Sequence, residues 1–323
     1  MEKFGIVFIT DRGFFVPTVV AITSLLENRN SETCYHIYLI QTFDQEGYRK
    51  IIDRISKKYG CDIEIIVVEE NYIEKTYGEI VTHKCNATHT ALLKFDIPNL
   101  CKNEKRVLYL DGDIVVRHDL GEIFRREFEP GKCIQAVLDS GGIYSTDNQF
   151  DYFNSGFIFM DLDYMRSHGI SEKLFMRKRE DDDISLMDQN VFNQVLRDHL
   201  MVLPHRFNIM YPNLVRAKYF KSISISMVNA FFDTCYSDFE DIFESASVVH
   251  YASFEKPWLY SDTVKVSLWE QYYKMTEVGN IKLKRKKMHL NLIFSLGIVG
   301  KIIWTIEKKF KNTENEAFEN IEF

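Results

Sequence analysis

The 323-residue sequence has few of the residues that mark specialised folds. It contains 15 glycines, 6 prolines and 6 cysteines, and the cysteines are scattered, without the paired spacing of a zinc site or a disulfide framework. We therefore expect reduced thiols in a cytosolic protein. No Gly-x-Gly-x-x-Gly fingerprint follows the first strand-like run, which disfavours a dinucleotide-binding protein. The net charge is −7, and we expect no nucleic-acid partner.

The sequence also has no apolar run of clear membrane-spanning length. The apolar segment 290–306 has 17 residues and is interrupted by Lys301, whereas a transmembrane helix needs about 20. No cleavable signal peptide is visible, because Met1-Glu2-Lys3 leads directly into a strand-like run. No internal repeat or low-complexity linker occurs before about residue 280, which predicts one continuous catalytic unit.

Apolar β-type runs alternate with helical patterns over the first 140 residues. The expected order is strand 4–9, helix 17–28, strand 35–40, helix 45–59, strand 62–68, a helical segment 88–100 that Pro98 interrupts, and strand 106–110. Further strands are expected at 133–138, 157–161 and 248–250, and a helix at 187–198. This alternation predicts an α/β fold with a central, mostly parallel sheet and right-handed crossovers.

Two acidic residues follow the strand 106–110. Asp111 and Asp113 flank Gly112 at the C-terminal end of this strand, where ligands bind in open α/β sheets. Alternate side chains of a strand point to the same side, so both carboxylates can face one point. Without a cation, their like charges would repel each other. The pattern favours a divalent-metal site, although Asp-Gly is also a common turn dipeptide.

Other polar segments occur where a metal-nucleotide site would need them. Asp11 and Phe14 follow the first strand, which is the position for a nucleotide base and ribose. In Asn154-Ser155-Gly156, an amide side chain is combined with a glycine that permits close approach to a polar ligand.

Two later segments also offer polar groups. Asp188 and Gln189 begin a predicted helix, where they are either helix caps or contacts to sugar hydroxyls. His250 offers an imidazole ligand, and Lys256 follows six residues later. A single His is more often a structural residue than a ligand, and the same applies to a single Lys.

In order and spacing, residues 4–260 resemble family 8 glycosyltransferases, the retaining, nucleotide-sugar-dependent enzymes of bacterial lipopolysaccharide and polysaccharide assembly. The resemblance implies a GT-A-type, single Rossmann-like nucleotide-sugar-binding domain. It also implies Mn²⁺ as cofactor (Mg²⁺ being the alternative), a UDP-hexose donor carrying glucose or galactose, and a glycan or glycolipid acceptor.

The resemblance further implies a role for each matching residue. Asp111-Gly112-Asp113 matches the Asp-x-Asp that holds Mn²⁺ and the donor diphosphate, His250 the third metal ligand, and Lys256 the lysine that meets the donor phosphate. A segment that lines the sugar is matched by Asn154, Ser155 and Gly156, and the catalytic residues beside the anomeric carbon are matched by Asp188 and Gln189. Asp11 matches a residue that contacts uracil, and Asp139 matches a residue that contacts the acceptor.

The sequence departs from the family pattern at two places. Lys94 stands where an Arg is common, which keeps the charge for the donor phosphate but loses the bidentate geometry. Arg12-Gly13 replaces a more polar pair, which leaves Phe14 as a stacking ring for the base. Retention could proceed by front-face attack or through a covalent intermediate on Gln189 or Asp188, and the sequence leaves both open.

Two other functions are compatible with parts of the sequence. A haloacid-dehalogenase-type phosphatase also has Asp-x-Asp after an apolar strand, and it would use Asp111 as nucleophile and Asp113 as general acid. That motif normally opens its domain, whereas three strand-helix units precede it here. A non-catalytic sugar-binding protein is the other alternative, because fold does not determine function.

The C-terminal segment has a charge pattern of its own. Residues 281–310 carry a net charge of +7, the end 311–323 carries −3, and the first 280 residues carry −11. We expect a catalytic domain at 1–275, a basic amphipathic helical tail at 276–310 and a disordered acidic end at 311–323. Such a tail predicts a cytoplasmic enzyme associated peripherally with the anionic inner face of a membrane, or else a helix packed on the body. No pattern predicts an oligomeric state.

Overall fold

The structure is a computed structural model. It describes residues 3–69, 71–78, 89–144, 151–180, 188–220, 222–276, 278–279, 283, 285–296 and 298–311. The strands are β1 (Lys3–Thr10), β2 (Cys34–Gln41), β3 (Asp62–Val67), β4 (Arg106–Leu110), β5 (Ile114–Val116), β6 (Ile134–Leu138), β7 (Phe153–Asp161), β8 (Leu200–Val202) and β9 (Val248–His250).

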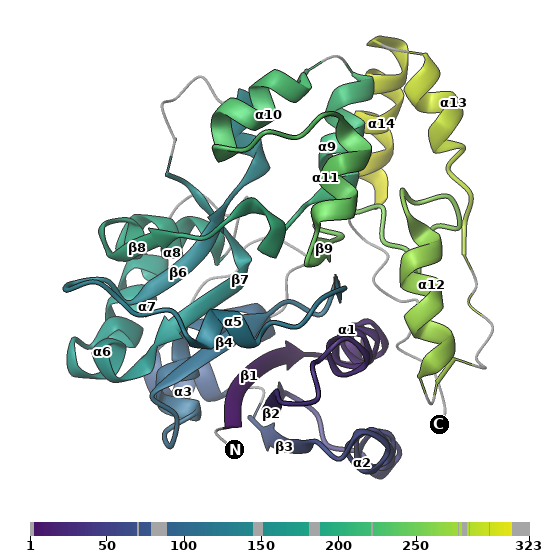
Figure 1. Ribbon diagram of the computed structural model, residues 1–323. Coiled ribbons are helices and arrows are strands. Elements are labelled where there is room, and N and C mark those ends of the chain that lie inside the picture. The colour runs from purple at the N-terminus through teal and green to yellow at the C-terminus, as the bar shows by residue number, and fades with distance from the viewer. Residues whose placement is uncertain are drawn as a thin grey trace.

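The helices lie mainly between and after these strands (Figure 1). They are α1 (Phe15–Glu27), α2 (Glu46–Tyr59), α3 (Tyr72–Tyr77), α4 (Ile97–Leu100), α5 (Gly121–Phe124), α6 (Leu162–Ser167), α7 (Ile170–Arg179), α8 (Gln189–Leu196), α9 (Tyr211–Tyr219), α10 (Ile225–Phe232), α11 (Phe239–Ser245), α12 (Val266–Met275), α13 (Leu290–Ser295) and α14 (Ile298–Lys311). Short 3₁₀ helices include η1 (His89–Asp96), η2 (Ser140–Tyr144) and η4 (His205–Phe207).

The main sheet has seven strands in the order β3-β2-β1-β4-β7-β6-β8. The first four strands are parallel, β7 runs antiparallel to both β4 and β6, and β6 pairs parallel with β8. The expected mixed and mostly parallel α/β sheet is therefore confirmed. Strands β5 and β9 form a separate antiparallel pair.

Helices cover both faces of the sheet and produce two hydrophobic cores. In β1, Ile6 and Phe8 belong to the core under α1, α2, α9 and α12, whereas Val7 and Ile9 belong to the core under α4, α6, α7 and α8. This division follows from the two-residue side-chain period of a strand. Because both faces are buried, the strand is apolar from Phe4 to Ile9 and carries polar side chains only at its two ends, Lys3 and Thr10.

The segment around Pro98 differs from the sequence expectation. Pro98 was expected to interrupt a helix, but it lies in the first turn of α4, directly after η1. Proline is tolerated there because the first helical N–H groups have no intrahelical acceptor. Thr88, the first residue of the expected helix, lies outside the described residues.

The tail is helical over two pieces rather than one. Helices α13 and α14 contact each other and lie beside α9 in Figure 1, where they are drawn in yellow. Met288, Leu290 and Ile293 form a small buried cluster with Tyr260 of the body. Among the described residues, no helix combines the length and apolar character needed to cross a bilayer.

Candidate active site

Asp111 and Asp113 lie in the turn that joins β4 to β5. The Asp111 N–H donates to the Gly156 carbonyl (2.9 Å), which ties the turn to β7. A Cβ on Gly112 would lie 2.3 Å from Thr18 Oγ1, so this turn packs directly against α1. The expectation that a strand would align the two carboxylates is therefore wrong, because the strand ends at Leu110 and the turn brings them together.

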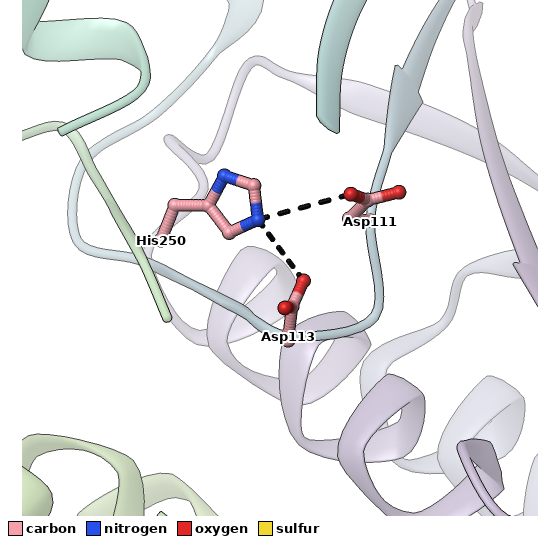
Figure 2. A group of neighbouring side chains, drawn as sticks. All are labelled: Asp111, Asp113 and His250. Carbon is pink, nitrogen blue, oxygen red and sulfur yellow. Dashed lines mark hydrogen bonds and ion pairs between the residues drawn. The ribbon is translucent and has the colours of Figure 1, made fainter. Parts of the chain in front are cut away.

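His250 completes a group of three potential metal ligands (Figure 2). It ends β9 and lies opposite Ile114 of β5, so backbone pairing carries it to the turn. His250 Nε2 is 3.1 Å from Asp113 Oδ1 and 3.7 Å from Asp111 Oδ2. One ligand atom from each residue lies within 4.8 Å of the others, so two distant segments of the chain present donors to one point.

Gly156 explains how β7 passes this group. A Cβ at position 156 would be 2.4 Å from His250 Cε1 and 2.6 Å from Asp111 Oδ2. Any side chain there would have to displace a member of the group. Two carboxylates and one imidazole suit a divalent cation such as Mn²⁺ or Mg²⁺, so the residues present fit the metal that the sequence implies.

Lys256 pairs with one of the two carboxylates. Its Nζ lies 2.5 Å from Asp113 Oδ2 and 2.7 Å from the Tyr251 carbonyl. Burial alone would raise the pKa of Asp113, but Lys256 and His250 outweigh it and hold this pKa well below its usual range. Asp113 is therefore a carboxylate at neutral pH.

Lys94 joins the group Asp111, Asp113 and His250 to the start of α8. Its buried Nζ lies 2.8 Å from Asp188 Oδ2 and 3.0 Å from Asp111 Oδ1. Burial would lower the pKa of Lys94, but Asp111 and Asp188 together raise it above its usual value. Lys94 thus places a fixed positive charge inside the site.

Asp188 and Gln189 are polar contacts of the site at the start of α8. Asp188 precedes α8, but its side chain makes no capping bond and instead accepts from Ser155 Oγ (2.8 Å). The helix-cap alternative is therefore wrong for this residue. Gln189 Oε1 accepts from the Ser155 N–H (3.1 Å) and from Asn154 Nδ2 (2.9 Å), while its Nε2 donates to Asp139 Oδ2 (3.0 Å).

Asp11 and Phe14 lie at the end of β1, which neighbours β4 in the sheet. Asp11 Oδ1 accepts from the Phe14 N–H (2.9 Å). The Phe14 ring packs edge-on against Trp258, with the ring centroids 5.5 Å apart. Trp258 follows Lys256 by two residues, so the contact between Phe14 and Trp258 connects the end of β1 to the loop that carries Lys256.

Sequence reasoning missed two residues that contact the group Asp111, Asp113 and His250. Tyr109 donates to Asp111 Oδ1 (2.5 Å), and burial together with Asp111 raises its pKa well above the usual value. Its position two residues before Asp111 on the strand was the available signal. Asn208 Oδ1 lies 2.9 Å from His250 Nδ1, and no local sequence pattern marks Asn208.

Comparisons with known proteins identify the family. The family model described as Glycosyl transferase family 8 matches residues 5–262. The chain belongs to glycosyl transferase family 8. It is therefore an enzyme that transfers sugar residues, and the phosphatase and non-catalytic alternatives are set aside.

Individual relatives of this family 8 chain cover most of its length. General stress protein A of Bacillus subtilis is 27% identical over 274 residues, which covers 80% of this chain and 89% of that protein. A lipopolysaccharide 1,2-glucosyltransferase of Escherichia coli is 22% identical over 296 residues, which covers 88% of this chain and 82% of that protein. The galactosyltransferase LgtC, solved with donor and acceptor sugar analogs, superposes with a TM-score of 0.67 at 18% identity and covers 84% of this chain and 96% of that one. This similarity confirms the GT-A-type fold.

Proposed function

We propose that this family 8 enzyme is a metal-dependent retaining hexosyltransferase that moves glucose or galactose from a UDP-sugar to a glycan acceptor. The observation that carries the proposal is the convergence of Asp111, Asp113 and His250 on one point beside Lys256. The names of relatives, a lipopolysaccharide 1,2-glucosyltransferase and a lipopolysaccharide 1,3-galactosyltransferase, support the hexose and a lipid-linked lipopolysaccharide or surface-polysaccharide acceptor.

Cleavage of the donor leaves a nucleoside diphosphate, so catalysis needs fixed positive charge at the leaving group. A divalent cation held by Asp111, Asp113 and His250 would act there as a Lewis acid, and oxygen ligands with one imidazole favour Mn²⁺ over Mg²⁺. The ammonium of Lys256, 2.5 Å from Asp113, would meet the donor phosphate. Lys94 would add a second positive charge from inside the site.

The remaining residues would hold the two ends of the donor. Asp11 would contact the uracil, and Phe14 would stack on it from the end of β1. Asn154, Ser155 and Gly156 would line the hexose. This assignment is supported by the hydrogen bonds that join Asn154 and Ser155 to Gln189, the residue proposed to lie beside the anomeric carbon.

We favour front-face attack for the retaining step. An amide is a poor nucleophile, and both ends of the Gln189 amide are already hydrogen-bonded. The Asp188 carboxylate is paired with Lys94, which reduces its nucleophilicity. The acceptor hydroxyl oxygen would bond to the anomeric carbon on the face that the diphosphate leaves. The departing phosphate oxygen would keep the bonding electron pair and take the hydroxyl proton.

The substitution Asp113→Ala tests the metal assignment. We expect loss of Mn²⁺-dependent UDP binding in calorimetry with the fold retained, because one of three ligands and the partner of Lys256 are removed together. A panel of UDP- and GDP-sugars with Mn²⁺, scored by donor hydrolysis, identifies the hexose and the nucleotide. If Asp113→Ala binds UDP as tightly as the unaltered enzyme, the metal-site assignment is contradicted. If the enzyme hydrolyses only GDP-sugars, the assignment of a UDP-sugar as donor is contradicted.

We also propose that the tail 276–310 binds an anionic membrane surface. Part of the tail packs on the body, as the buried Met288, Leu290 and Ile293 show. Another part leaves large apolar side chains exposed, namely Leu292, Leu296, Val299 and Ile302. Apolar side chains beside basic residues are typical of helices that lie in a membrane interface.

A further inference from the structure

The hydrogen bonds that link Gly156, Asn154, Asn208 and His250 Nδ1 allow only one arrangement of donors and acceptors. The Gly156 N–H can only donate, and it lies 3.0 Å from Asn154 Oδ1. That oxygen also lies 2.8 Å from the side-chain amide of Asn208, which must therefore present its Nδ2–H there. The other end of the Asn208 amide is then its carbonyl oxygen.

This orientation determines which nitrogen of His250 carries a proton. Asn208 Oδ1 lies 2.9 Å from His250 Nδ1, and because an amide oxygen only accepts, Nδ1 must be the N–H. In the neutral imidazole, the lone pair then lies on Nε2. Nε2 is the nitrogen that faces Asp111 and Asp113 (Figure 2).

The backbone holds Asn208 in place independently of its side chain. The neighbouring Ile209 N–H donates to the Val248 carbonyl (3.0 Å), and the His250 N–H donates to the Ile209 carbonyl (2.9 Å). The segment that carries Asn208 is thus joined to β9, the strand that carries His250. The Asn208 side chain itself is fully buried.

We propose that Asn208 is a positioning residue that holds His250 in the Nδ1–H tautomer and so keeps Nε2 available for a divalent cation. The inference rests on the proposed metal-dependent function. The same hydrogen-bond chain continues from Asn154 Nδ2 to Gln189 Oε1, 2.9 Å away. Asn208 therefore also connects the metal-binding group to the residues proposed to surround the hexose.

The test compares two variants of Asn208 by direct Mn²⁺ binding. Asn208→Ala removes the acceptor for Nδ1–H, and we expect Mn²⁺ affinity, measured by electron paramagnetic resonance of free Mn²⁺, to fall by about 10- to 100-fold. Asn208→Asp keeps an oxygen toward Nδ1–H but loses the N–H donated to Asn154 Oδ1, so we expect a loss of Mn²⁺ affinity smaller than that of Asn208→Ala. Gln135→Ala is the matched control, since Gln135 is an equally buried amide that bonds to Arg126 and Glu127. Its Mn²⁺ affinity should not change.

A second measurement needs neither a variant of Asn208 nor a metal. Long-range ¹H–¹⁵N spectra of the ¹⁵N-labelled enzyme, with the His250 signals assigned by their loss in His250→Gln, distinguish the two neutral tautomers. The spectra are recorded at a pH at which the ring is neutral. A neutral ring protonated on Nδ1 supports the inference, and a neutral ring protonated on Nε2 overturns it. Unchanged Mn²⁺ affinity in Asn208→Ala would also overturn it. If the unaltered enzyme binds no Mn²⁺, the proposed metal dependence fails, whereas the tautomer measurement still tests Asn208.

Discussion

At the scale of single residues, two glycines control how closely the backbone approaches the proposed metal site of Asp111, Asp113 and His250. Gly112 lets the β4–β5 turn pack on Thr18, and Gly156 lets β7 pass beside His250 and Asp111. Neither glycine has a positive φ, so their importance is space rather than backbone conformation. The arrangement of Asp111, Asp113 and His250 therefore depends on the absence of side chains at positions 112 and 156.

Substitution of Gly156 tests this space requirement. In Gly156→Ala, the new methyl group would have to displace His250 or Asp111, and we expect Mn²⁺ affinity to fall by about tenfold. Gly131→Ala is the control, because Gly131 has a φ of +82° with nothing near its Cβ position. That variant should lose about 1–2 kcal/mol of unfolding free energy, because a Cβ is disfavoured at positive φ, and should keep its Mn²⁺ affinity. Equal Mn²⁺ affinities in both variants would show that β7 shifts to accommodate the methyl group without disturbing His250 or Asp111.

Asp139 tests the assignment of the acceptor side. Its Oδ2 accepts from Gln189 Nε2 and Asn154 Nδ2, and its Oδ1 accepts from the Gly141 N–H. We expect Asp139→Asn to reduce sugar transfer while largely sparing donor hydrolysis, because only transfer needs a contact with the acceptor. The two rates are measured on the same preparation with and without acceptor. Equal losses would place Asp139 on the donor side or in a purely structural role.

At the scale of elements, helix α14 supports the loop that carries Lys256. Trp304 of α14 donates from its indole to Glu255, which is buried and immediately precedes Lys256. Arg216 of α9 donates to the same carboxylate (2.9 Å) and lies 4.3 Å from the centroid of the Trp304 ring. The tail is thus in contact with the loop that carries Lys256 as well as with the core.

The substitution Trp304→Phe tests whether this contact affects function. It keeps an aromatic ring but removes the N–H donor to Glu255, and a hydrogen bond to a charged group contributes about 1.5–3 kcal/mol. We expect a several-fold rise in the KM for donor with little change in kcat, measured by donor hydrolysis. Ile302→Ala, at an exposed position of the same helix, is the control. An unchanged KM together with reduced stability in denaturant would mean that α14 only packs on the body.

At the scale of the whole molecule, charge is strongly separated along the chain. The first 280 residues carry −11 and residues 281–310 carry +7. Among the described residues of the tail, Arg285 is paired with Glu270 (2.5 Å). The side chains of Lys286, Lys287 and Lys301 are exposed. An anionic surface should therefore attract the tail and repel the body, which would orient the enzyme on a membrane.

Vesicle sedimentation tests whether the tail binds an anionic surface. We expect the full-length enzyme to sediment with anionic vesicles at low salt, and to do so less at high salt because salt screens the attraction. Each basic residue near such a surface contributes about 1 kcal/mol. The double variant Val299→Asp/Ile302→Asp should lose most of this binding, whereas Val202→Asp, at an exposed valine of the edge strand β8, should not. Absence of binding by the unaltered enzyme at low salt would contradict a membrane-binding tail.

Much of this architecture was predictable from the sequence alone. The alternation of apolar runs and amphipathic segments determined the order of the first strands and helices, because each pattern depends only on neighbours along the chain. The motif around Asp111 and Asp113 and the resemblance to family 8 together identified the family, and they predicted that Asp111, Asp113 and His250 lie together, as they do in the structure. The expectation for Pro98 was wrong because its place in the first turn of α4 depends on where η1 ends.

Only the tertiary structure decided how these residues meet. His250 is 137 positions from Asp113, and their contact depends on the pairing of β9 with β5. Lys94 lies between Asp111 and Asp188, and Asn208 bonds to His250. The helical or strand periodicity of the local sequence predicts neither contact. Sequence patterns report the side of an element on which a residue lies. The partner of a polar side chain depends on how whole elements pack, and that is a property of the complete fold.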